Sequence, residues 1–234
     1  MVFAKPGNIS GYCENGIANC PLVEGLTTNE GAQILAMARK RRFSRHDLLC
    51  MDGELVKDIY LITEGAVKVM KFTEGGDAVI FGIGLPGDII CPGTLFQSCK
   101  YSSTVVSLRP TKALSWPVQS FKAILDRCPL LFQNYLQIQH SHMLEIEERF
   151  CEMATKTVNQ RLARQLTRLH GRVVGMANGM TEIGVSREEL AQMTGTTAFS
   201  ACRALVEWEA RGIIRSRRES VTICDAESLR ALSE

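Results

Sequence analysis

A change in sequence periodicity near residue 117 constrains the fold of this chain more than any other feature. Before it, short runs of apolar and β-branched residues alternate with turns rich in Gly, Asp and Pro. Antiparallel sandwiches and barrels show this texture, with a turn about every 8–12 residues. The runs that predict strands are 48–51, 58–63, 66–72, 78–83, 102–106 and 112–116. We therefore expect an N-terminal antiparallel β-roll of the jelly-roll type over residues 42–117 and, with the helices that flank and follow it, an α+β protein.

Helical periodicity flanks the predicted roll on both sides. Asn29–Lys40 predicts a short opening helix, because Ile34, Leu35 and Ala38 fall on one helical face. Beyond residue 117, apolar positions recur in alternating steps of four and three, the spacing of a coiled-coil seam. These positions are Phe132, Leu136, Gln139, Met143, Ile146, Phe150 and Met153, with one polar member. A long dimerisation helix within residues 118–155 is one interpretation, and an amphipathic helix lying on the β-roll is the other.

The C-terminal part is predicted to be mainly helical. A helix is expected from Thr157 to Gly171, followed by a loop or small hairpin over Arg172–Gly179. Ser186 and Glu189 then have the spacing of a capping box, in which each side chain satisfies a free backbone amide of the other residue. This pair predicts the start of a short helix that ends near Met193.

The segment after this short helix predicts a winged helix-turn-helix. Thr194–Thr196 predicts a tight turn, and Thr197–Arg211 predicts a second helix closed by Gly212 in the left-handed conformation. The residues spaced to pack the two helices together are Leu190, Ala201 and Leu205. Ile213–Ile223 has the pattern of strand, basic turn and strand, which indicates a wing able to contact a DNA backbone. An ordinary helical hairpin is the alternative, and the combination of cap, glycines and arginine-rich wing disfavours it.

Charge is distributed unevenly along the chain. Residues 1–155 carry 15 Lys and Arg against 16 Asp and Glu, a net charge of −1, whereas residues 156–234 carry 12 against 9, a net charge of +3. Eleven of the twelve C-terminal cations are arginine, whose planar fork suits phosphates and guanine edges. We divide the chain into a β-roll domain over residues 1–117, a long helix over 118–155 and a winged helix-turn-helix domain over 156–234.

The chain resembles the Crp/Fnr family of bacterial transcription regulators over nearly all of its length. Asp58–Val69, Leu85–Asp88 and Ser186–Ile214 match the family's most characteristic stretches in order and spacing. The resemblance implies a β-roll that senses an effector, a long helix that forms the seam of a homodimer, and a C-terminal domain that binds a palindromic operator in double-stranded DNA. It also implies contact with RNA polymerase.

The resemblance places the DNA-reading surface on the second helix of the helix-turn-helix. Arg203 occupies the family's arginine position and is the candidate for a bidentate contact to guanine. The family's commonest reading helix has an Arg-Glu pair where this chain has Ala198 and Phe199, so we expect a different half-site. Phe199 either contacts a thymine methyl group or is buried in the domain core. The candidates for phosphate contacts are Thr197, Ser200, Arg187, Arg217 and Arg218, with solvated charges as the alternative for the three arginines.

Cyclic AMP is disfavoured as the effector. The family's cyclic-nucleotide site has Gly-Glu for the ribose and Arg-Ser or Arg-Thr for the phosphate, where this chain has Cys91-Pro92 and Tyr101-Ser102. A cyclic phosphate buried without that arginine would lack its counter-charge, which is costly. We therefore expect an effector of another kind, a redox signal, a gas or a small molecule.

The nine cysteines leave the sensing chemistry open. Their number is odd and no export signal precedes them, so a disulfide framework is not expected. The family's oxygen sensors hold an iron–sulfur cluster on three clustered N-terminal cysteines and a fourth in the roll, but here the triplet is missing and Leu114 takes the fourth position. The thiolates that could still contribute are Cys13, Cys20, Cys50, Cys91 and Cys99. A cluster, haem, a thiol switch and a soluble ligand all stay open, and no cofactor is assigned.

Several function classes are disfavoured by what the sequence lacks. The longest apolar run, residues 78–85, is far shorter than the roughly 20 residues that span a bilayer. The N-terminus does not resemble a secretory signal, so we expect a cytoplasmic protein without a membrane partner. We find no phosphate loop, nucleophile elbow, zinc-protease motif or Cys-x-x-Cys, so no enzyme is expected. A sensor whose C-terminal domain docks onto a protein is the alternative to DNA binding.

Overall fold

The computed structural model of the chain describes residues 20–91, 99–174 and 182–234. The chain divides into two compact units, one made of residues up to 71 with 81–145 and the other of residues 72–80 with 146–234. A long helix over residues 129–155 contributes to both units. The domain boundaries expected after residues 117 and 155 stay predictions. No described helix combines the length and apolar character needed to cross a membrane.

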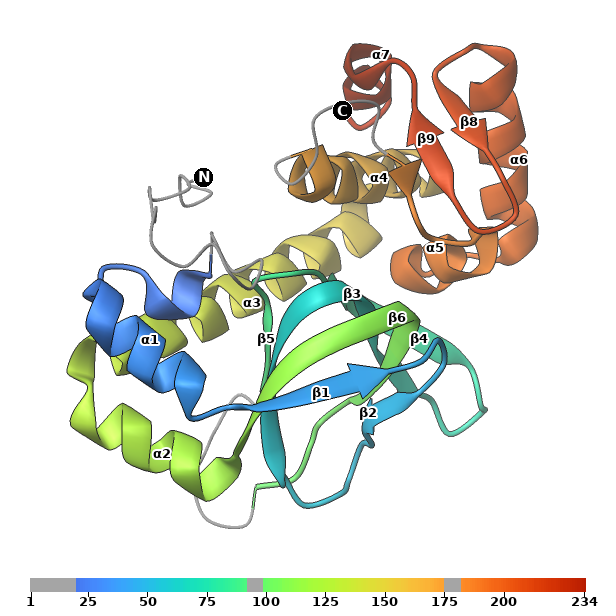
Figure 1. The fold of residues 1–234 in the computed structure, drawn as a ribbon. Helices are drawn as coiled ribbons and strands as arrows, with labels where there is room; N and C mark the ends of the chain where they lie inside the picture. Colours follow the sequence, from blue (N-terminus) through green and yellow to red (C-terminus); the bar gives the residue numbers. More distant parts are fainter. Residues whose placement is uncertain (1–19, 92–98, 175–181) are drawn as a thin grey trace. The chain divides into compact units, whose positions relative to one another are not determined.

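Antiparallel β-structure dominates the first unit, as predicted (Figure 1). The strands of the roll are β1 (Arg39–Phe43), β2 (Leu48–Cys50), β3 (Asp58–Phe72), β4 (Ala78–Gly84), β5 (Ile89–Ile90) and β6 (Thr104–Pro117), of which residues 72 and 78–80 fall in the second unit. The sheet order is β1-β6-β3-β4, with β2 also paired to β6 and β5 to β3. Strand β6 pairs antiparallel with β1, β2 and β3, so this long strand organises the roll.

Two of the turns predicted in the roll are wrong. Glu64-Gly65 lies inside β3, and the segment between residues 106 and 112 lies inside β6. The register between the two strands shifts near Gly65, so the pairing bends there without ending. Gly65 has a φ of 90°, and a Cβ there would lie 2.5 Å from the carbonyl oxygen of Pro110. The glycine therefore marks a close approach of two strands, and no hairpin forms.

The opening helix is shorter than predicted. Helix α1 comprises Thr28–Ala36, begins at a capping box and ends at Met37. Arg39 and Lys40, which were expected in the helix, belong to β1. Their backbones pair with Ser115 and Leu114 of β6, so a long-range pairing decides their conformation over the local helical pattern.

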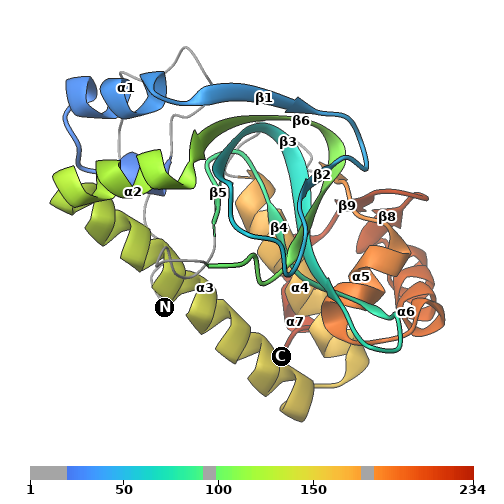
Figure 2. The ribbon, with the colours of Figure 1, turned by 90° about the horizontal axis from the view of Figure 1, so that it is seen from below.

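Two helices follow β6, and the first of them and the start of the second pack into the core of the roll. Helix α2 (Val118–Arg127) leads into the long helix α3 (Pro129–Thr155), as Figure 2 shows. Cys128 separates them with a non-helical backbone, and proline is well tolerated in the first turn that follows. Asn134 of α3 donates to the carbonyl oxygens of Leu22 (3.0 Å), within the 3-10 helix η2 (Pro21–Val23), and of Glu24 (2.7 Å), directly after it. The largest fully buried side chains of this unit are Trp116, Phe121, Leu22, Ile59, Leu61, Ile62 and Leu131.

The second unit combines helices with a small sheet. Its elements after α3 are α4 (Val158–Val174), β7 (Glu182–Ile183), α5 (Arg187–Thr194), α6 (Ala198–Ala210), β8 (Ile214–Ser216), β9 (Val221–Ile223) and α7 (Ala226–Ala231). The strand order is β7-β9-β8. Helix α4 continues past Gly171, so the prediction that it stops there is wrong by three residues. The rest of the loop predicted over 172–179 lies outside the described residues.

Candidate nucleic-acid interface

Helices α5 and α6 form the predicted helix-turn-helix through local hydrogen bonds. The Ser186 hydroxyl accepts from the Glu189 amide (3.1 Å), and the Glu189 carboxylate accepts from the Ser186 amide (2.9 Å), which completes the capping box. Gly195 has φ 59° and ψ 47°, the left-handed conformation that turns the chain between the helices. The Thr197 hydroxyl then accepts from the Ser200 amide (3.1 Å) and caps α6. The two caps and the glycine fix both helix boundaries within one residue of the prediction.

One face of α6 is buried in the core of the second unit. Leu190, Ala201 and Leu205 are fully buried, as expected for the residues that pack the two helices together. Trp208 is also fully buried one turn further along α6. Because Ala201, Leu205 and Trp208 share one face of α6, the opposite face is free to meet another molecule.

The exposed face of α6 carries most of the predicted DNA contacts. Ala198, Phe199 and Arg203 are exposed. Phe199 is 73% exposed, so the alternative that it is buried in the domain core is wrong. Thr197 is exposed as well, and its hydroxyl donates to the half-buried Ser200 hydroxyl (3.0 Å). The arrangement presents a ring, a guanidinium and two hydroxyls on and beside the first two turns of the helix.

A hollow lies beside this face of α6, within the second unit. It has a volume of about 600 Å³ and lies between α6 and the start of α4. Phe199, Arg203 and Val206 line it from α6, and Val158 and Asn159 line it from α4. Phe199 and Val206 supply apolar surface and Arg203 a positive charge, so the hollow suits a ligand that has both apolar and anionic or acceptor groups.

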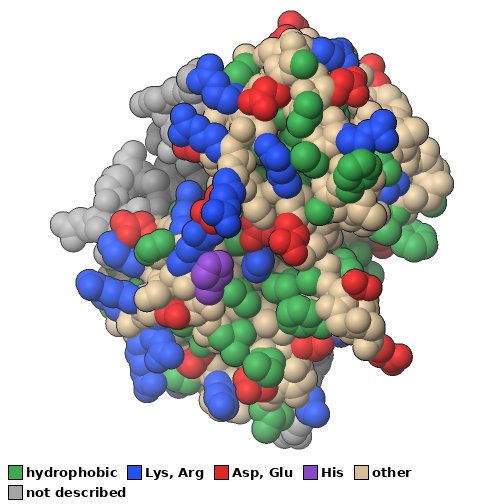
Figure 3. Space-filling view, turned by 90° about the vertical axis from the view of Figure 1, so that its right-hand side faces the viewer, with side chains coloured by type: hydrophobic (Ala, Val, Ile, Leu, Met, Phe, Trp, Pro, Cys, Tyr) green, Lys and Arg blue, Asp and Glu red, His purple; other side chains and the backbone are tan. Residues whose placement is uncertain are grey.

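The wing that follows α6 forms as predicted. Strands β8 and β9 pair antiparallel, and the Arg217 amide donates to the Ser220 carbonyl (2.8 Å) across their turn. Arg217 and Arg218 are exposed at this turn, where they can reach a phosphate backbone. Basic side chains, in blue, are spread over the face of the molecule shown in Figure 3, among hydrophobic ones in green.

Arg187 lies in a different setting from the wing arginines. Its Nε donates to the Ser216 hydroxyl (3.4 Å) in β8, and its Nη1 donates to the Cys202 sulfur (3.4 Å) in α6. The side chain is half-buried and joins the start of α5 to both the wing and α6. Arg187 therefore links the parts of the predicted DNA-binding surface, of which the sequence predicted it to be a member.

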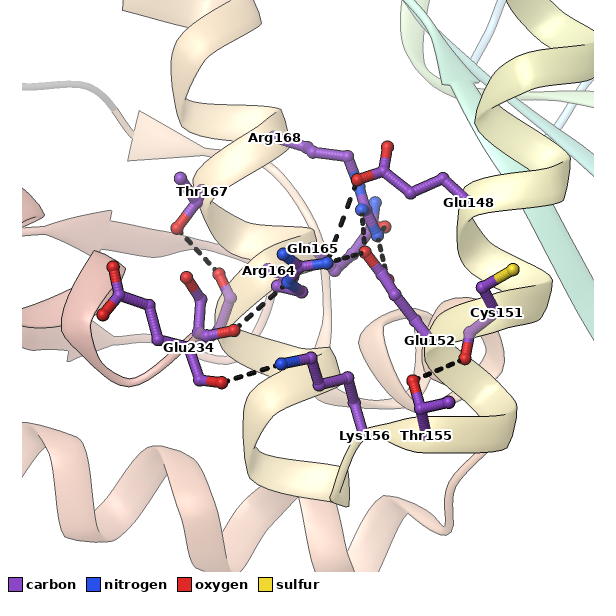
Figure 4. Close-up of polar contacts among 12 residues, drawn as sticks. Glu148, Cys151, Glu152, Thr155, Lys156, Arg164, Gln165, Thr167, Arg168 and Glu234 are labelled. Atoms are coloured by element: carbon purple, nitrogen blue, oxygen red, sulfur yellow. Dashed lines mark hydrogen bonds and ion pairs between the residues drawn. The ribbon is translucent and has the colours of Figure 1, made fainter. Parts of the chain in front are cut away.

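A buried carboxylate holds α4 against the last turns of α3, a feature that sequence reasoning missed. Figure 4 shows Glu152 of α3 pointing at Arg164 and Arg168 of α4. Arg168 donates two hydrogen bonds to the Glu152 carboxylate (2.7 and 2.9 Å), and Arg164 donates a third (2.9 Å). Burial raises the pKa of Glu152, but these bonds and charges lower it more, so its pKa lies below the usual range. Because the partners are on two helices, no sequence spacing signals this cluster.

The predicted seam residues of α3 lie along an exposed row. Six are exposed large apolar side chains, with Phe150 73% exposed: Phe132, Leu136, Met143, Ile146, Phe150 and Met153. The seventh, Gln139, is half-buried and donates to the Cys91 sulfur (3.0 Å). The α3 residues buried in the first unit are different ones, Leu131, Asn134 and Tyr135. The packing of α3 on this unit therefore leaves the seam row uncovered.

The cysteines proposed as thiolate ligands are dispersed. Cys20 and Cys50 are buried, and burial raises the pKa of Cys20 to about 11 and that of Cys50 to about 12. Burial also raises the pKa of Cys91 to about 12. Among residues 20–91, 99–174 and 182–234, no group of three or more His, Cys, Asp or Glu side chains could hold a metal ion. Cys99 is half-buried and belongs to no such group, and Cys13 lies outside the described residues.

Of the positions matched to the family's cyclic-nucleotide site, Tyr101 makes a structural contact within the roll. Tyr101 is buried, and its hydroxyl donates to the Asp58 carbonyl (2.7 Å) and accepts from the Asp58 amide (3.2 Å). Ser102 beside it is exposed, and Pro92 lies outside the described residues. In the part of the chain that the structure describes, no lysine or arginine is fully buried, so no buried cation is available there for a cyclic phosphate.

Comparison with known protein families gives a match for the roll and a match for the helix-turn-helix domain. A model of the cyclic nucleotide-binding domain matches residues 40–128, and a model of the Crp-like helix-turn-helix domain matches residues 160–232. The chain belongs to the Crp/Fnr family. It is a transcription regulator of the Crp/Fnr type with a DNA-binding helix-turn-helix, which confirms that part of the expectation from its sequence.

Individual relatives within the Crp/Fnr family are distant in sequence. The CRP-like cAMP-activated global transcriptional regulator of Mycobacterium tuberculosis is 22% identical over 215 residues, which cover 91% of this chain and 96% of that protein. The transcriptional activator protein FnrA of Stutzerimonas stutzeri is 21% identical over 83% of this chain and 80% of its own length. The chain is thus similar both to a protein named for cyclic AMP and to one named after Fnr.

Solved structures share the fold. FixK2 from Bradyrhizobium japonicum has a TM-score of 0.76 at 18% identity and covers 84% of this chain and 98% of its own. The c-di-GMP responsive regulator CLP of Xanthomonas campestris has a TM-score of 0.69 at 20% identity, with 83% and 98% covered. At these identities the likeness supports the α+β architecture of a Crp/Fnr protein.

Proposed function

We propose that this Crp/Fnr regulator is a homodimer that binds a palindromic operator in double-stranded DNA and responds to an effector other than cyclic AMP. The observation that carries the proposal is the uncovered row of apolar side chains on α3. We also propose that it acts with RNA polymerase, resides in the cytoplasm without a membrane partner and has no enzymatic activity. These statements follow the family to which the chain belongs.

The seam row supports a parallel pair of α3 helices. Its steps of four and three keep one stripe facing a partner over three heptads. Taking a large apolar side chain from full exposure to full burial contributes about 1.5–3 kcal/mol. The six seam side chains are 44–73% exposed, so each contributes part of that against the cost of association. A second copy of the chain presents the same stripe, which makes the interface self-complementary.

Neighbouring residues on α3 allow a matched test of the dimer. Met143 lies in the seam row and Leu144 lies outside it, yet both are exposed. We expect Met143→Lys to shift the sedimentation equilibrium towards monomer, while Leu144→Lys leaves the dimer intact. Equal behaviour of the two variants, or a monomeric parent protein, would overturn the homodimer.

The DNA-binding proposal assigns a role to each exposed residue of the reading surface. Arg203 donates two hydrogen bonds to a guanine edge, a contact that discriminates bases by about 1–3 kcal/mol. Ala198 and Phe199 lie beside it in the first turn of α6. Phosphates are contacted by Thr197, Ser200, Arg187, Arg217 and Arg218, with Arg187 acting mainly through its bracing contacts.

Gel shifts with promoter fragments test this surface. Arg203→Ala is expected to lose selectivity between fragments, and Arg218→Ala to weaken binding to all of them alike. The affinity should also fall steeply with added salt, because neutralised phosphates release counterions. Unchanged selectivity in Arg203→Ala would remove its base-reading role. Salt-independent binding would favour a domain that docks onto a protein.

An effector other than cyclic AMP is supported by the chemistry of the described roll. Tyr101 takes the place of the family's phosphate-binding arginine, and its hydroxyl is hydrogen-bonded to the backbone of Asp58. Segment 92–98 contains no basic residue either. Titration calorimetry with cyclic AMP should therefore show no binding. A visible spectrum of protein purified without oxygen, with iron and sulfide analysis, separates a cluster or haem from a thiol switch or a soluble ligand.

A further inference from the structure

Phe199 is a large apolar side chain that the fold leaves exposed. It is 73% exposed in the first turn of α6, while Ala201, Ala204 and Leu205 of the same helix are buried. A phenyl ring is among the largest apolar side chains, and leaving it in water forgoes the free energy of its burial. The exposed ring is therefore available to contact another molecule.

Phe199 shares its helix face with the arginine of the reading helix. Arg203 follows four residues later, and side chains at this spacing lie next to each other on a helix. Both residues line the hollow beside α6, together with Val206. Because the N-terminal residues of a reading helix are those that meet base edges in the major groove, the ring lies on the DNA-binding surface.

We propose that Phe199 reads the 5-methyl group of a thymine in each half-site of the operator. The ring has no hydrogen-bond donor or acceptor, so it cannot read the polar edges of the other bases. The thymine methyl is the apolar group that a base pair presents in the major groove. Neighbouring Ala198 has no polar side-chain group to compete for that base.

The guanine contact fixes where this thymine lies. In zinc fingers, whose helices also enter the major groove, side chains about three residues apart contact successive bases. Phe199 and Arg203 are four residues apart, so the thymine is one or two base pairs from the guanine contacted by Arg203. The inference rests on the proposed operator binding and adds the identity of a second base.

Replacing thymine by deoxyuridine in the DNA removes only this methyl group. The operator is first selected from a pool of random duplexes with the full chain, and each thymine of a half-site is then replaced in turn. We expect one replacement to weaken binding by about fourfold per half-site, the effect of one methyl group returned to water. Phe199→Ala should weaken binding to the thymine operator by a similar factor. Deoxyuridine at that position should then weaken the binding of this variant no further.

Two variants control the interpretation. Phe199→Leu keeps an apolar contact and should retain part of the response to deoxyuridine. Val206→Ala removes another exposed apolar side chain from the hollow, about two turns further from the helix start, and should keep the full response. Since Phe199 is exposed, all three proteins should unfold at the temperature of the parent chain.

The outcomes separate this inference from the proposed function. If guanine selectivity is lost in Arg203→Ala but no deoxyuridine replacement weakens binding, the thymine contact is wrong and operator binding stands. The same holds if Phe199→Ala responds to deoxyuridine as the parent does. If the pool yields no preferred sequence at all, operator binding itself fails.

Discussion

Arg187 and Arg203 show how neighbouring arginines on one motif can take different roles. Arg203 is exposed on α6, and no hydrogen bond or ion pair joins it to the described residues. Arg187 contacts Ser216 and Cys202 instead and ties the wing to the reading helix. Residue type and spacing suggested DNA contact for both. The position of Arg187 between three elements shows that it also holds this surface together.

Thiol reactivity should differ sharply between cysteines. Cys20 and Cys50 are buried with raised pKa values, whereas Cys224 is exposed. Since the thiolate is the nucleophile, a buried protonated thiol reacts slowly. We expect iodoacetamide at pH 8 to label Cys224 well before Cys20 and Cys50, as measured by peptide mass spectrometry. Equal labelling rates in the folded protein would contradict the burial of this core.

Two glycines provide a matched pair for backbone strain. Gly65 and Gly53 both have a positive φ, but a Cβ at Gly65 would meet backbone at 2.5 Å and one at Gly53 would meet nothing within 4 Å. Gly53→Ala should cost about 1–2 kcal/mol, from the left-handed conformation alone. Gly65→Ala should cost about 3 kcal/mol or more, because strands must also move apart. Thermal unfolding measures both, and equal losses would contradict the close approach of β3 and β6.

At the scale of elements, local signals were predictable and long-range pairing was not. The ends of α5 and α6 follow from a capping box, a threonine cap and a left-handed glycine, all within a few residues. Strand β3 runs through Glu64-Gly65 because β6 pairs with it on both sides of the irregularity. The same dependence on a distant partner moved Arg39 and Lys40 from helix to strand. The exposure of Phe199 likewise depended on which face of α6 packs.

The Glu152 cluster is predicted to stabilise the junction of α3 and α4. Glu152→Gln keeps the shape but removes the charge that Arg164 and Arg168 share. Hydrogen bonds to charged groups contribute about 1.5–3 kcal/mol each, and part is retained by the amide, so we expect a loss of about 2 kcal/mol. Glu148→Gln is the control, since Glu148 is exposed and 3.8 Å from Arg164. Calorimetric unfolding at pH 7 should show a shift only for Glu152→Gln.

The same cluster gives stability a pH dependence of defined sign. Although burial raises the pKa of Glu152, Arg168 and Arg164 bring it below the usual range. A carboxylate with a depressed folded pKa contributes its full stabilisation above its unfolded pKa, about 4.3, and loses it as pH falls through the folded value. The difference in unfolding temperature between parent and Glu152→Gln should be largest near pH 7 and narrow below about pH 4. A constant difference down to pH 3 would show that the charge contributes nothing.

At the scale of the whole molecule, two surfaces are left exposed by the described residues. One is the apolar row of α3, and the other is the exposed face of α6 with Phe199 and Arg203. The periodicity of residues 132–153 predicted the first from sequence, because a seam must repeat along one helix. The sequence could not identify the sensing chemistry, since the cysteines are scattered along the chain and their burial depends on the folded roll.

The central claim is that two copies of α6 meet one duplex together. Two-fold dimers of this kind read half-sites one helical turn apart, about 10–10.5 base pairs centre to centre. The most direct test measures the Kd of the full chain by fluorescence anisotropy for the selected operator and for the same operator with five base pairs inserted between its half-sites. The insertion turns one half-site to the opposite side of the duplex. We predict that binding weakens by about 100-fold or more, because simultaneous engagement is lost; equal affinity for the two duplexes would contradict the account.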